Sequence, residues 1–218
     1  MLPTLSLFED SFRNGETVEA PLPARPRMLY VVHGSVSIDG RRYADGEAWY
    51  GEGAVAPSAG ATGATVWRWE LAALEAVPAV APPVRSARKH IAALETLPPG
   101  ELLLRGDSVT FGPGGCAYRH VHQGPGIRCL LEGGIRIDVH GESTSYGPGG
   151  AWFEAGPDPV FAQAADRPTR FIRVMILPRA LLGKSSIRYV DDADCNRPKT
   201  QVYQVLVDAP IAFPGARA

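Results

Sequence analysis

The sequence has 218 residues, of which 45% are hydrophobic and 21% are charged, as in an ordinary globular protein. This composition excludes a largely disordered chain or a coiled coil, and the length allows one large domain or two small ones. The 22 basic and 23 acidic residues give a net charge of −1 and form no basic stripe, so we expect no nucleic-acid partner.

The sequence shows no recognisable targeting signal and no disulfide framework, so we expect a cytoplasmic protein. No stretch approaches the roughly 18 consecutive apolar residues of a membrane helix, so we expect no membrane partner. The N-terminus lacks the basic region and apolar core of a signal peptide. Cys116, Cys129 and Cys195 form neither a disulfide framework nor a CxxC motif.

The first half of the chain has the pattern of short strands joined by tight turns. An apolar run at 28–32 leads through a turn into an alternating segment at 35–38, and Asp39-Gly40 then supplies a strong hairpin signal. A further strand with aromatic and β-branched residues is predicted at 65–71. The 24 glycines and 20 prolines, well above average usage, favour many turns.

A segment between the two halves is predicted to be a linker. Prolines bracket residues 81–100, and Ser86 could cap a short helix within them. We therefore expect an N-terminal domain at 1–80, a linker with one short helix at 81–100, and a C-terminal domain with its tail at 101–218.

The second half repeats the order of the first about a hundred residues later, which indicates an internal duplication of an all-β unit. The Leu-Leu-Glu-Gly sequence at 130–133 corresponds to Val-Val-His-Gly at 31–34, and Ala151-Trp152 corresponds to Ala48-Trp49. The pattern predicts two sandwiches or barrels. Alternation at 201–207 adds a tail strand, which could cross to the other half or to a second subunit.

The densest polar cluster lies at 114–128. Alternate side chains of a strand share a face, so Tyr118, His120 and His122 should lie on the same side. Two imidazoles two residues apart can converge on one metal ion, and neutral imidazole suits Zn, Cu, Fe and Ni. Two ligands do not hold a metal tightly, so at least one more must come from elsewhere.

This cluster resembles the first motif of the cupin family, Gly-x5-His-x-His-x3–4-Glu-x6-Gly. Gly114, His120, His122 and Gly133 fall on that spacing, whereas Gly126 stands at the position of the glutamate ligand. Residues 149–163 resemble the second motif without its histidine. The resemblance covers most of 101–180 and, more faintly, 26–72, where no His-x-His occurs.

The resemblance implies an all-β fold of two jelly-roll cupin barrels in one chain, a bicupin with a degenerate metal motif. It places the site in the C-terminal barrel, with His120 and His122 on a divalent ion (Zn, Fe, Mn or Ni) and with Gln123, Glu154 or water completing the shell. The inward-facing position of the missing glutamate implies that Arg128 also lines the interior, where it could hold a carboxylate. Glycine at 126 would leave room for a ligand.

Each candidate also has a purely structural interpretation. The two histidines could hydrogen-bond inside a barrel that has lost its metal, and Arg128 could pair with an internal acid or with a neighbouring subunit. Tyr118 could be a packed barrel residue with a satisfied hydroxyl. Glu154 could be an exposed residue of the barrel rim.

Three functions remain open. The first is a metal-dependent enzyme acting on a small carboxylate-bearing molecule, with isomerase, lyase or hydrolase chemistry favoured over a dioxygenase and with Arg128 holding the carboxylate. The second is a metal-free enzyme of sugar-epimerase type, in which a histidine and Tyr118 act as base and acid. The third is a non-catalytic small-molecule-binding module. In each case we expect a homodimer, because exposed tail strands could pair across a two-fold axis.

Overall fold

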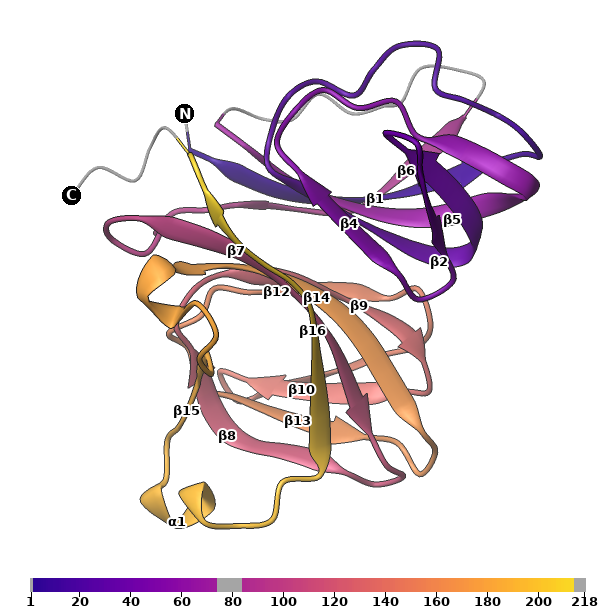
Figure 1. The fold of residues 1–218 in the computed structure, drawn as a ribbon. Coiled ribbons are helices and arrows are strands. Elements are labelled where there is room, and N and C mark those ends of the chain that lie inside the picture. Colours follow the sequence, from indigo (N-terminus) through magenta and orange to yellow (C-terminus); the bar gives the residue numbers. More distant parts are fainter. Residues whose placement is uncertain (1, 74–83, 214–218) are drawn as a thin grey trace. The chain divides into compact units, whose positions relative to one another are not determined.

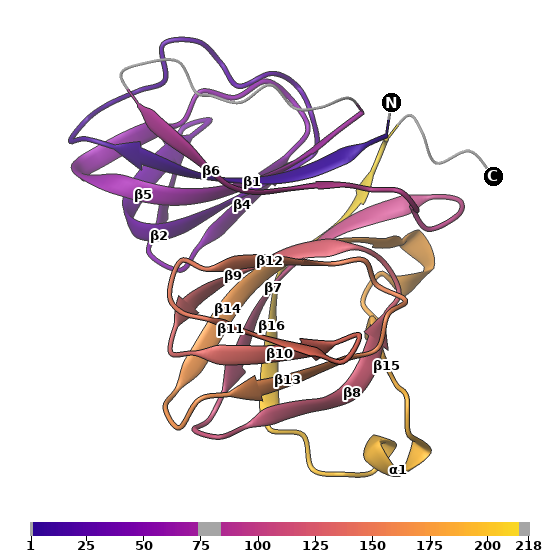
Figure 2. The same cartoon turned by 180° about the vertical axis from the view of Figure 1, so that it is seen from behind.

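The computed structural model describes residues 2–73 and 84–213, and nearly all of their regular structure is β-strand (Figures 1 and 2). The chain divides into two compact units, one running to Glu95 and the other from Thr96 to Pro210. The all-β prediction is therefore confirmed. None of the described helices is long and apolar enough to cross a membrane.

The N-terminal unit consists of one antiparallel sheet. The strand order is β3-β2-β5-β1-β6, and β4 also pairs with β2. The strands are β1 (Thr4–Phe12), β2 (Arg27–Ile38), β3 (Arg41–Ala44), β4 (Ala48–Gly51), β5 (Ser58–Ala72) and β6 (Arg85–Ala93). Buried Leu29, Val31 and Val66 belong to its apolar core. Alternation along β2 and β5 places these side chains on one face of the sheet, where the unit excludes water.

The C-terminal unit consists of two five-stranded sheets that lie face to face in Figures 1 and 2. The first has the order β11-β10-β13-β8-β15 and the second the order β12-β9-β14-β7-β16. The elements are β7 (Leu102–Phe111), β8 (Cys116–His122), β9 (Gly126–Glu132), β10 (Ile135–Val139), β11 (Glu142–Tyr146), β12 (Ala151–Glu154), β13 (Val160–Ala164), β14 (Thr169–Pro178), the 3₁₀ turn Arg179–Leu181, β15 (Ile187–Tyr189), α1 (Asp192–Cys195) and β16 (Gln201–Ile211).

The core of the C-terminal unit is built by both sheets. Ile137 and Val160 come from one sheet, and Phe111, Trp152 and Phe171 come from the other. Burial of these side chains supplies the main driving force for closing the two sheets on each other. The interior is therefore mostly apolar, so the charged residues it does contain need a specific explanation.

The two units share a strand-pairing plan. In the N-terminal unit β2 pairs with β4 and β5, and in the C-terminal unit β9 pairs with β12 and β14. Leu29 lies opposite Arg68 in the first register, and Arg128 lies opposite Arg173 in the second. The C-terminal unit has β8 between β7 and β9 in the chain, whereas residues 13–26, between β1 and β2, make only two isolated bridges among the residues described. In the described part of the N-terminal unit, no strand thus corresponds to the one that carries the two histidines.

The expected linker helix is wrong. Residues 85–93 form β6, which runs antiparallel to β1 at the edge of the N-terminal sheet, and Ser86 Oγ donates a hydrogen bond to Asp10 Oδ1 at 2.5 Å instead of capping a helix. A segment this short gains little from helix formation alone, whereas pairing satisfies the open edge of β1. Residues 81–83 lie outside the described part of the chain.

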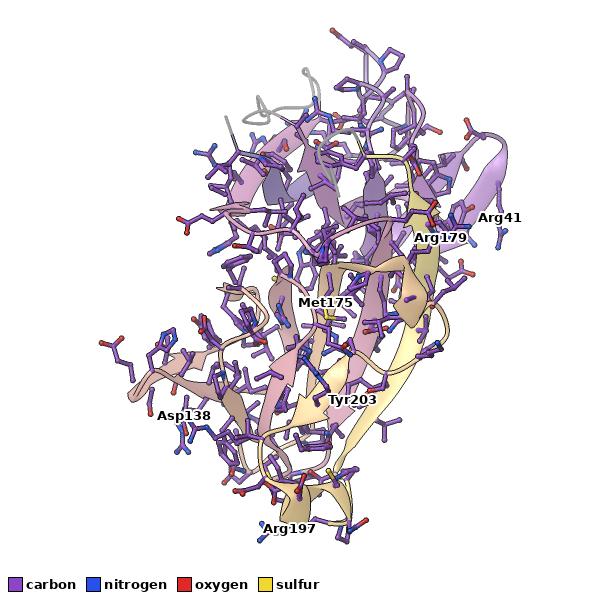
Figure 3. The ribbon with its side chains drawn as sticks, turned by 90° about the vertical axis from the view of Figure 1, so that its left-hand side faces the viewer. Arg41, Asp138, Met175, Arg179, Arg197 and Tyr203 are labelled. Carbon is purple, nitrogen blue, oxygen red and sulfur yellow. The ribbon has the colours of Figure 1, made fainter. Side chains whose placement is uncertain are left out.

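The predicted tail strand is confirmed. It is β16, and it lies beside β7 at the edge of the second C-terminal sheet of the same chain. Figure 3 shows this strand with Tyr203, whose side chain is one of those that line the interior of the unit. The tail therefore contributes a side chain to the lining of this interior.

Candidate functional site

The two histidines point into the C-terminal barrel from β8. A bulge in β8 sets this orientation, because Val160 and Ala162, two residues apart on β13, face His120 and Ala117, three residues apart on β8. His120 and His122 are each only 4% exposed and line an internal cavity. The bulge reverses the alternation upstream of His120, so Ala117 rather than Tyr118 faces the cavity.

The imidazoles of His120 and His122 contact each other directly. Their Nε2 atoms are 3.2 Å apart, and His120 Nδ1 donates to the Tyr118 carbonyl oxygen at 2.7 Å. A neutral His120 with its proton on Nδ1 can only accept at Nε2, so His122 donates from Nε2. This leaves Nδ1 of His122 unprotonated, and that buried atom has no hydrogen-bond partner among the described residues.

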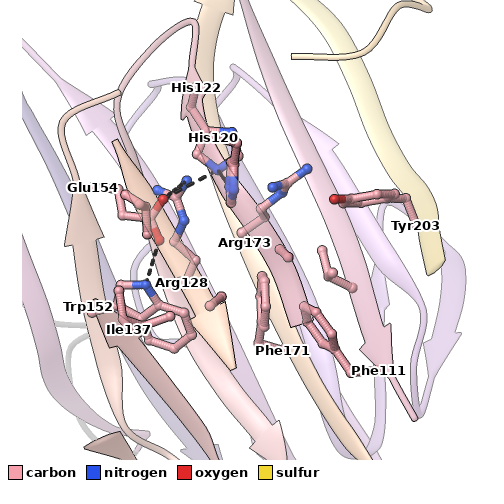
Figure 4. A pocket seen from close by; sticks show the side chains of 14 residues that line it. Phe111, His120, His122, Arg128, Ile137, Trp152, Glu154, Phe171, Arg173 and Tyr203 are labelled. Carbon is pink, nitrogen blue, oxygen red and sulfur yellow. Dashed lines mark hydrogen bonds and ion pairs between the residues drawn. The ribbon is translucent and has the colours of Figure 1, made fainter. Parts of the chain in front are cut away.

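Arg128 and Glu154 form a buried ion pair beside the histidines (Figure 4). Arg128 Nη2 lies 2.8 Å from Glu154 Oε2, and Arg128 Nη1 donates to the Gly126 carbonyl oxygen at 2.6 Å. The same carboxylate oxygen lies 3.3 Å from His122 Nε2, and Trp152 Nε1 donates to the other oxygen at 2.8 Å. The indole therefore donates a hydrogen bond to Oε1, whereas Arg128 and His122 lie close to Oε2 without hydrogen-bond geometry.

A second arginine lies close to this group. Arg173 is 5% exposed, and its Nε and Nη2 donate to Asp107 Oδ2 at 3.0 and 2.8 Å. Its guanidinium lies over the ring of Tyr203, 5.2 Å from the centroid, and Figure 4 shows the two side chains on the side of the cavity away from Glu154. The cavity is therefore lined by two guanidiniums, each with its own carboxylate partner.

Burial and these charges set the protonation states of the site. Desolvation and the nearby Arg128 and Arg173 guanidiniums hold the pKa of His122 well below its usual value. Desolvation also lowers the pKa of His120, although Glu154 and the Tyr118 carbonyl oppose that shift. Burial lowers the pKa of Arg128 to about 10, so Arg128 is still charged at neutral pH. At neutral pH the site therefore holds neutral imidazoles beside charged guanidiniums.

The enclosed space is small. The cavity that His120, His122, Arg128 and Glu154 line has a volume of about 20 Å³, and a single water molecule needs roughly 10–15 Å³. It adjoins a larger hollow of about 240 Å³, which Glu154 also lines. Glu154 thus lies at the boundary between the inner cavity and the outer hollow.

The structure brings together four of the six predicted site residues: His120, His122, Arg128 and Glu154 line one cavity. Their assigned roles stay predictions. Tyr118 and Gln123 do not line it, and the expectation that Tyr118 shares the histidine face is wrong because of the β8 bulge. The Tyr118 ring instead lies 5.2 Å from the Arg197 guanidinium and 5.8 Å from Lys199 Nζ. Gln123 follows the end of β8, and its backbone N–H donates to the Ser186 carbonyl oxygen at 3.2 Å.

Gly126 does not leave space for a ligand as expected. A Cβ atom at this position would lie 2.5 Å from the Val174 carbonyl oxygen and 2.7 Å from Met175 Cγ. Glycine is therefore required there by the close approach of β9 to β14. The room for a ligand lies beside Glu154 instead.

Sequence reasoning missed Arg173, Trp152 and Tyr203 as cavity residues. Arg173 carried a usable signal, because it is a charged residue in the middle of an otherwise apolar run at 171–177. The indole of Trp152 was expected to be a core residue, and it is 3% exposed, but its N–H is aimed at Glu154. Tyr203 had no local signal, since the tail could have paired elsewhere.

These side chains fit a tightly held divalent metal poorly. Two Nε2 atoms 3.2 Å apart can both reach a point ~2.1 Å away, which gives two ligands. A metal-bound histidine normally donates its other N–H to an acceptor, as His120 does, but Nδ1 of His122 has no partner among the described residues. The third possible ligand, Glu154, is paired with Arg128. Within the described residues, no group of three or more His, Cys, Asp or Glu side chains is arranged to hold a metal.

The described residues at the equivalent place of the N-terminal unit form a different set of contacts. Arg68, which corresponds in register to Arg173, is 2% exposed and bonds Asp10 Oδ2 at 2.6 Å and Glu70 Oε1 at 2.8 Å. Arg27 Nε also bonds Glu70 Oε1, at 3.0 Å. Leu29 stands where the other unit has Arg128. The buried arginines of the N-terminal unit are thus paired with buried carboxylates of the same unit, and we interpret these pairs as structural.

Comparison with known proteins supports the fold. No family model matches the sequence, and no curated protein matches it significantly. A deletion mutant of Bacillus subtilis oxalate decarboxylase superposes with a TM-score of 0.60 at 13% identity, over 88% of this chain and 73% of that one. AerE from Microcystis aeruginosa superposes with a TM-score of 0.57 at 13% identity, over 79% of this chain and 88% of that one. These likenesses show the fold alone, an antiparallel β architecture of jelly-roll type.

Proposed function

We propose that the C-terminal barrel is the active site of an enzyme that acts on a small molecule bearing a carboxylate group. The observation that supports this best is the meeting of a buried guanidinium and the His122 imidazole at one buried carboxylate, that of Glu154, with His120 bonded to His122 behind it. Strongly perturbed groups gathered in a cavity are typical of functional sites. One structural neighbour is an oxalate decarboxylase, and oxalate is a small dicarboxylate, which agrees with this substrate class.

Arg128 is the group that would bind the substrate carboxylate. Its Nη2 already holds a carboxylate oxygen, that of Glu154, at 2.8 Å. A substrate carboxylate that takes the place of Glu154 meets the same charged donor in a site largely shielded from water, where charge-assisted hydrogen bonds are strong. Glu154 is therefore an internal stand-in for the ligand, and it keeps the buried Arg128 paired while the site is empty.

His120 and His122 would move the protons. Because their pKa values are lowered, both imidazoles are neutral at physiological pH and can accept a proton. The unprotonated nitrogen without a hydrogen-bond partner among the described residues is His122 Nδ1, and a proton accepted there would leave an imidazolium whose Nε2 lies 3.3 Å from Glu154 Oε2. Proton transfer next to a bound carboxylate serves isomerase, lyase or hydrolase chemistry. We place these ahead of a dioxygenase, since the one carboxylate beside the imidazoles is bound to Arg128 and does not complete a free facial triad.

A binding experiment tests the role of Arg128. Acetate is added to the ¹⁵N-labelled protein, with chloride as the control for ionic strength, and the Trp152 indole N–H signal is followed by NMR. We expect saturable binding that weakens at least tenfold in Arg128→Gln. Glu154→Gln should bind acetate more tightly, because it removes the competing internal carboxylate. The double variant Arg128→Gln/Glu154→Gln controls for misfolding, since it leaves no unpaired buried charge. Equal acetate affinity in wild type and Arg128→Gln contradicts the proposal.

A reaction experiment tests the two histidines. Exchange of the pyruvate methyl protons for deuterium in D₂O is followed by proton NMR, and we expect wild type to accelerate it and His122→Gln to lose most of the acceleration. Metal content is measured on the same samples. One equivalent of metal in wild type that is lost in His120→Ala/His122→Ala would instead support the metal-dependent alternative, which stays a prediction. So do the small-molecule partner class and the cytoplasmic location.

A further inference from the structure

We propose that the outer hollow next to Glu154 binds an aromatic ring of the substrate, so that the substrate is a small aromatic carboxylate. This inference rests on the proposed function, because it assigns the carboxylate end of the same molecule to Arg128. The hollow lies wholly within the C-terminal unit, and its walls come from β10, β11, β12 and β13 together with the loop that follows β12.

The inner cavity and the outer hollow differ in volume, so they suit different parts of one ligand. The inner cavity, about 20 Å³, has room for a water molecule or a few polar atoms but not for a ring. The outer hollow measures about 240 Å³, and a buried apolar cavity of ~150 Å³ is enough for benzene. The outer hollow therefore has room for one ring with a substituent.

The walls of the outer hollow favour a flat apolar group. Tyr146 and Trp152 are stacked, with ring centroids 4.8 Å apart and an angle of 24° between planes. Ile137, Val139 and Val160 supply the aliphatic part of the lining. Aromatic pairs of this kind gain from a further ring placed offset or edge-on, and small-molecule sites are mostly apolar with a few placed polar groups.

The lining of the outer hollow includes one imidazole and two carboxylates, those of His140, Asp158 and Glu154. His140 Nε2 and Asp158 Oδ1 are 3.3 Å apart, and these side chains are 68% and 44% exposed, so they belong to the outer rim. At the inner end is Glu154, whose Oε1 accepts from Trp152 and whose Oε2 faces Arg128. Of the two guanidiniums that line the inner cavity, Arg128 is the one paired with Glu154, the carboxylate that lines both spaces.

The inner cavity and the outer hollow share part of their lining. Ile137, Trp152, Glu154 and Val160 line both the inner cavity and the outer hollow. A ligand carboxylate that replaces Glu154 at Arg128 therefore leaves the atoms attached to it on the side of the outer hollow. A ring bonded directly to that carboxylate would lie between the Tyr146–Trp152 stack and the aliphatic wall.

The test compares three probes and two variants by isothermal titration. Benzoate carries the ring and the carboxylate, acetate carries the carboxylate alone, and benzyl alcohol carries the ring alone. Thr144→Trp fills the outer hollow from an exposed position of β11 that lines it, and Ser145→Trp places the same side chain at the adjacent exposed position, which does not line it. Tryptophan is well tolerated in strands, so both variants should fold.

We expect wild type and Ser145→Trp to bind benzoate at least tenfold more tightly than acetate, with benzyl alcohol weakest. Thr144→Trp should lose the advantage of benzoate and keep the acetate affinity of wild type. If benzoate binds no better than acetate, or if Thr144→Trp keeps the advantage, the aromatic inference is overturned while the Arg128 site can still stand. If acetate binding is indifferent to Arg128→Gln, the proposed function fails first and this inference fails with it.

Discussion

Burial shifts the pKa values of Arg128, His120 and His122 below their ordinary values. A guanidinium that is 1% exposed loses its hydration, and the partners that replace water are Glu154 and the Gly126 carbonyl. Removing one partner of such a pair typically costs ~3–5 kcal/mol, whereas a surface pair contributes under ~1 kcal/mol. Removal of Glu154 alone would therefore leave Arg128 charged and without its partner in an apolar interior.

The protonation of His122 gives a pH prediction. In the unfolded chain a histidine gains a proton as the pH falls through its ordinary pKa of 6.5, whereas folded His122, with its pKa well below that value, does not. The unfolded state then binds more protons, so stability falls as the pH is lowered below about 6.5. We expect the melting temperature to drop between pH 7 and 5.5 by more in wild type than in His122→Gln. Parallel melting curves of the two proteins across this range would contradict the assignment.

At the scale of residues, the sequence located part of the site. His120, His122 and Arg128 followed from a motif and its spacing, and all three line the cavity. Tyr118 was also predicted to face the cavity, but it does not. One extra residue in β8 changes which side chains face inward, and sequence alternation does not reveal a bulge. Glu154 could be named as a candidate, but its pairing with Arg128 depends on the register between β9 and β12.

At the scale of elements, the turn after β12 holds the site together. Gly156 has φ +115°, and its carbonyl oxygen accepts from the His122 backbone N–H at 2.8 Å. This bond joins the end of β8, which carries the histidines, to the turn that follows Glu154. The turn thus sets the distance between the imidazoles and the carboxylate.

Gly156→Ala tests this turn. A Cβ atom there would lie 2.8 Å from the backbone C and O atoms of Gly124, in addition to the strain of a positive φ. Gly141→Ala is the matched control, because Gly141 has φ +80° with no heavy atom within 4 Å of its Cβ position. We expect destabilisation of about 1 kcal/mol for Gly141→Ala and about 3 kcal/mol for Gly156→Ala, measured by urea unfolding. Equal costs would show that the close approach to Gly124 is not tight.

The predicted linker helix shows why elements at an edge are hard to assign from sequence. Residues 85–93 contain alanine, arginine and lysine, which suit a helix, and prolines nearby favour a short one. The partner that decides their conformation is β1, about 80 residues earlier in the chain. Tertiary pairing overrides local propensity at such positions.

At the scale of the whole molecule, β16 gives a prediction about self-association. It lies at the end of its sheet, and Val202 and Val205 are 67% and 57% exposed on it. An edge strand with exposed apolar side chains invites pairing with another chain, so we expect a homodimer formed through β16. Val205→Lys should shift the protein toward monomer in light scattering. Val190→Lys, at a 47% exposed valine outside β16, should not. A wild-type monomer at tens of micromolar contradicts this prediction.

The two units share a strand-pairing plan but differ in the side chains of their interiors. Both units place an arginine at the same register, Arg68 and Arg173. In the N-terminal unit Asp10 and Glu70 surround that arginine, and no strand corresponds to β8 in the described residues there. In the C-terminal unit β8 adds two imidazoles and β9 adds a second arginine. One sheet plan therefore supports a closed ionic core in one unit and a cavity in the other.

The sequence by itself determined the all-β class, the repeated strand plan and the histidine pair, because these depend on side-chain period, turn residues and a local motif. Only the tertiary structure decided the direction of Tyr118, the conformation of residues 85–93 and the meeting of Arg128 with Glu154. These features depend on bulges and on registers between strands that are distant in the chain, and a shift of one residue turns a side chain to the opposite face of its sheet. The chemistry of the cavity was thus encoded in separate segments, and folding brought it together.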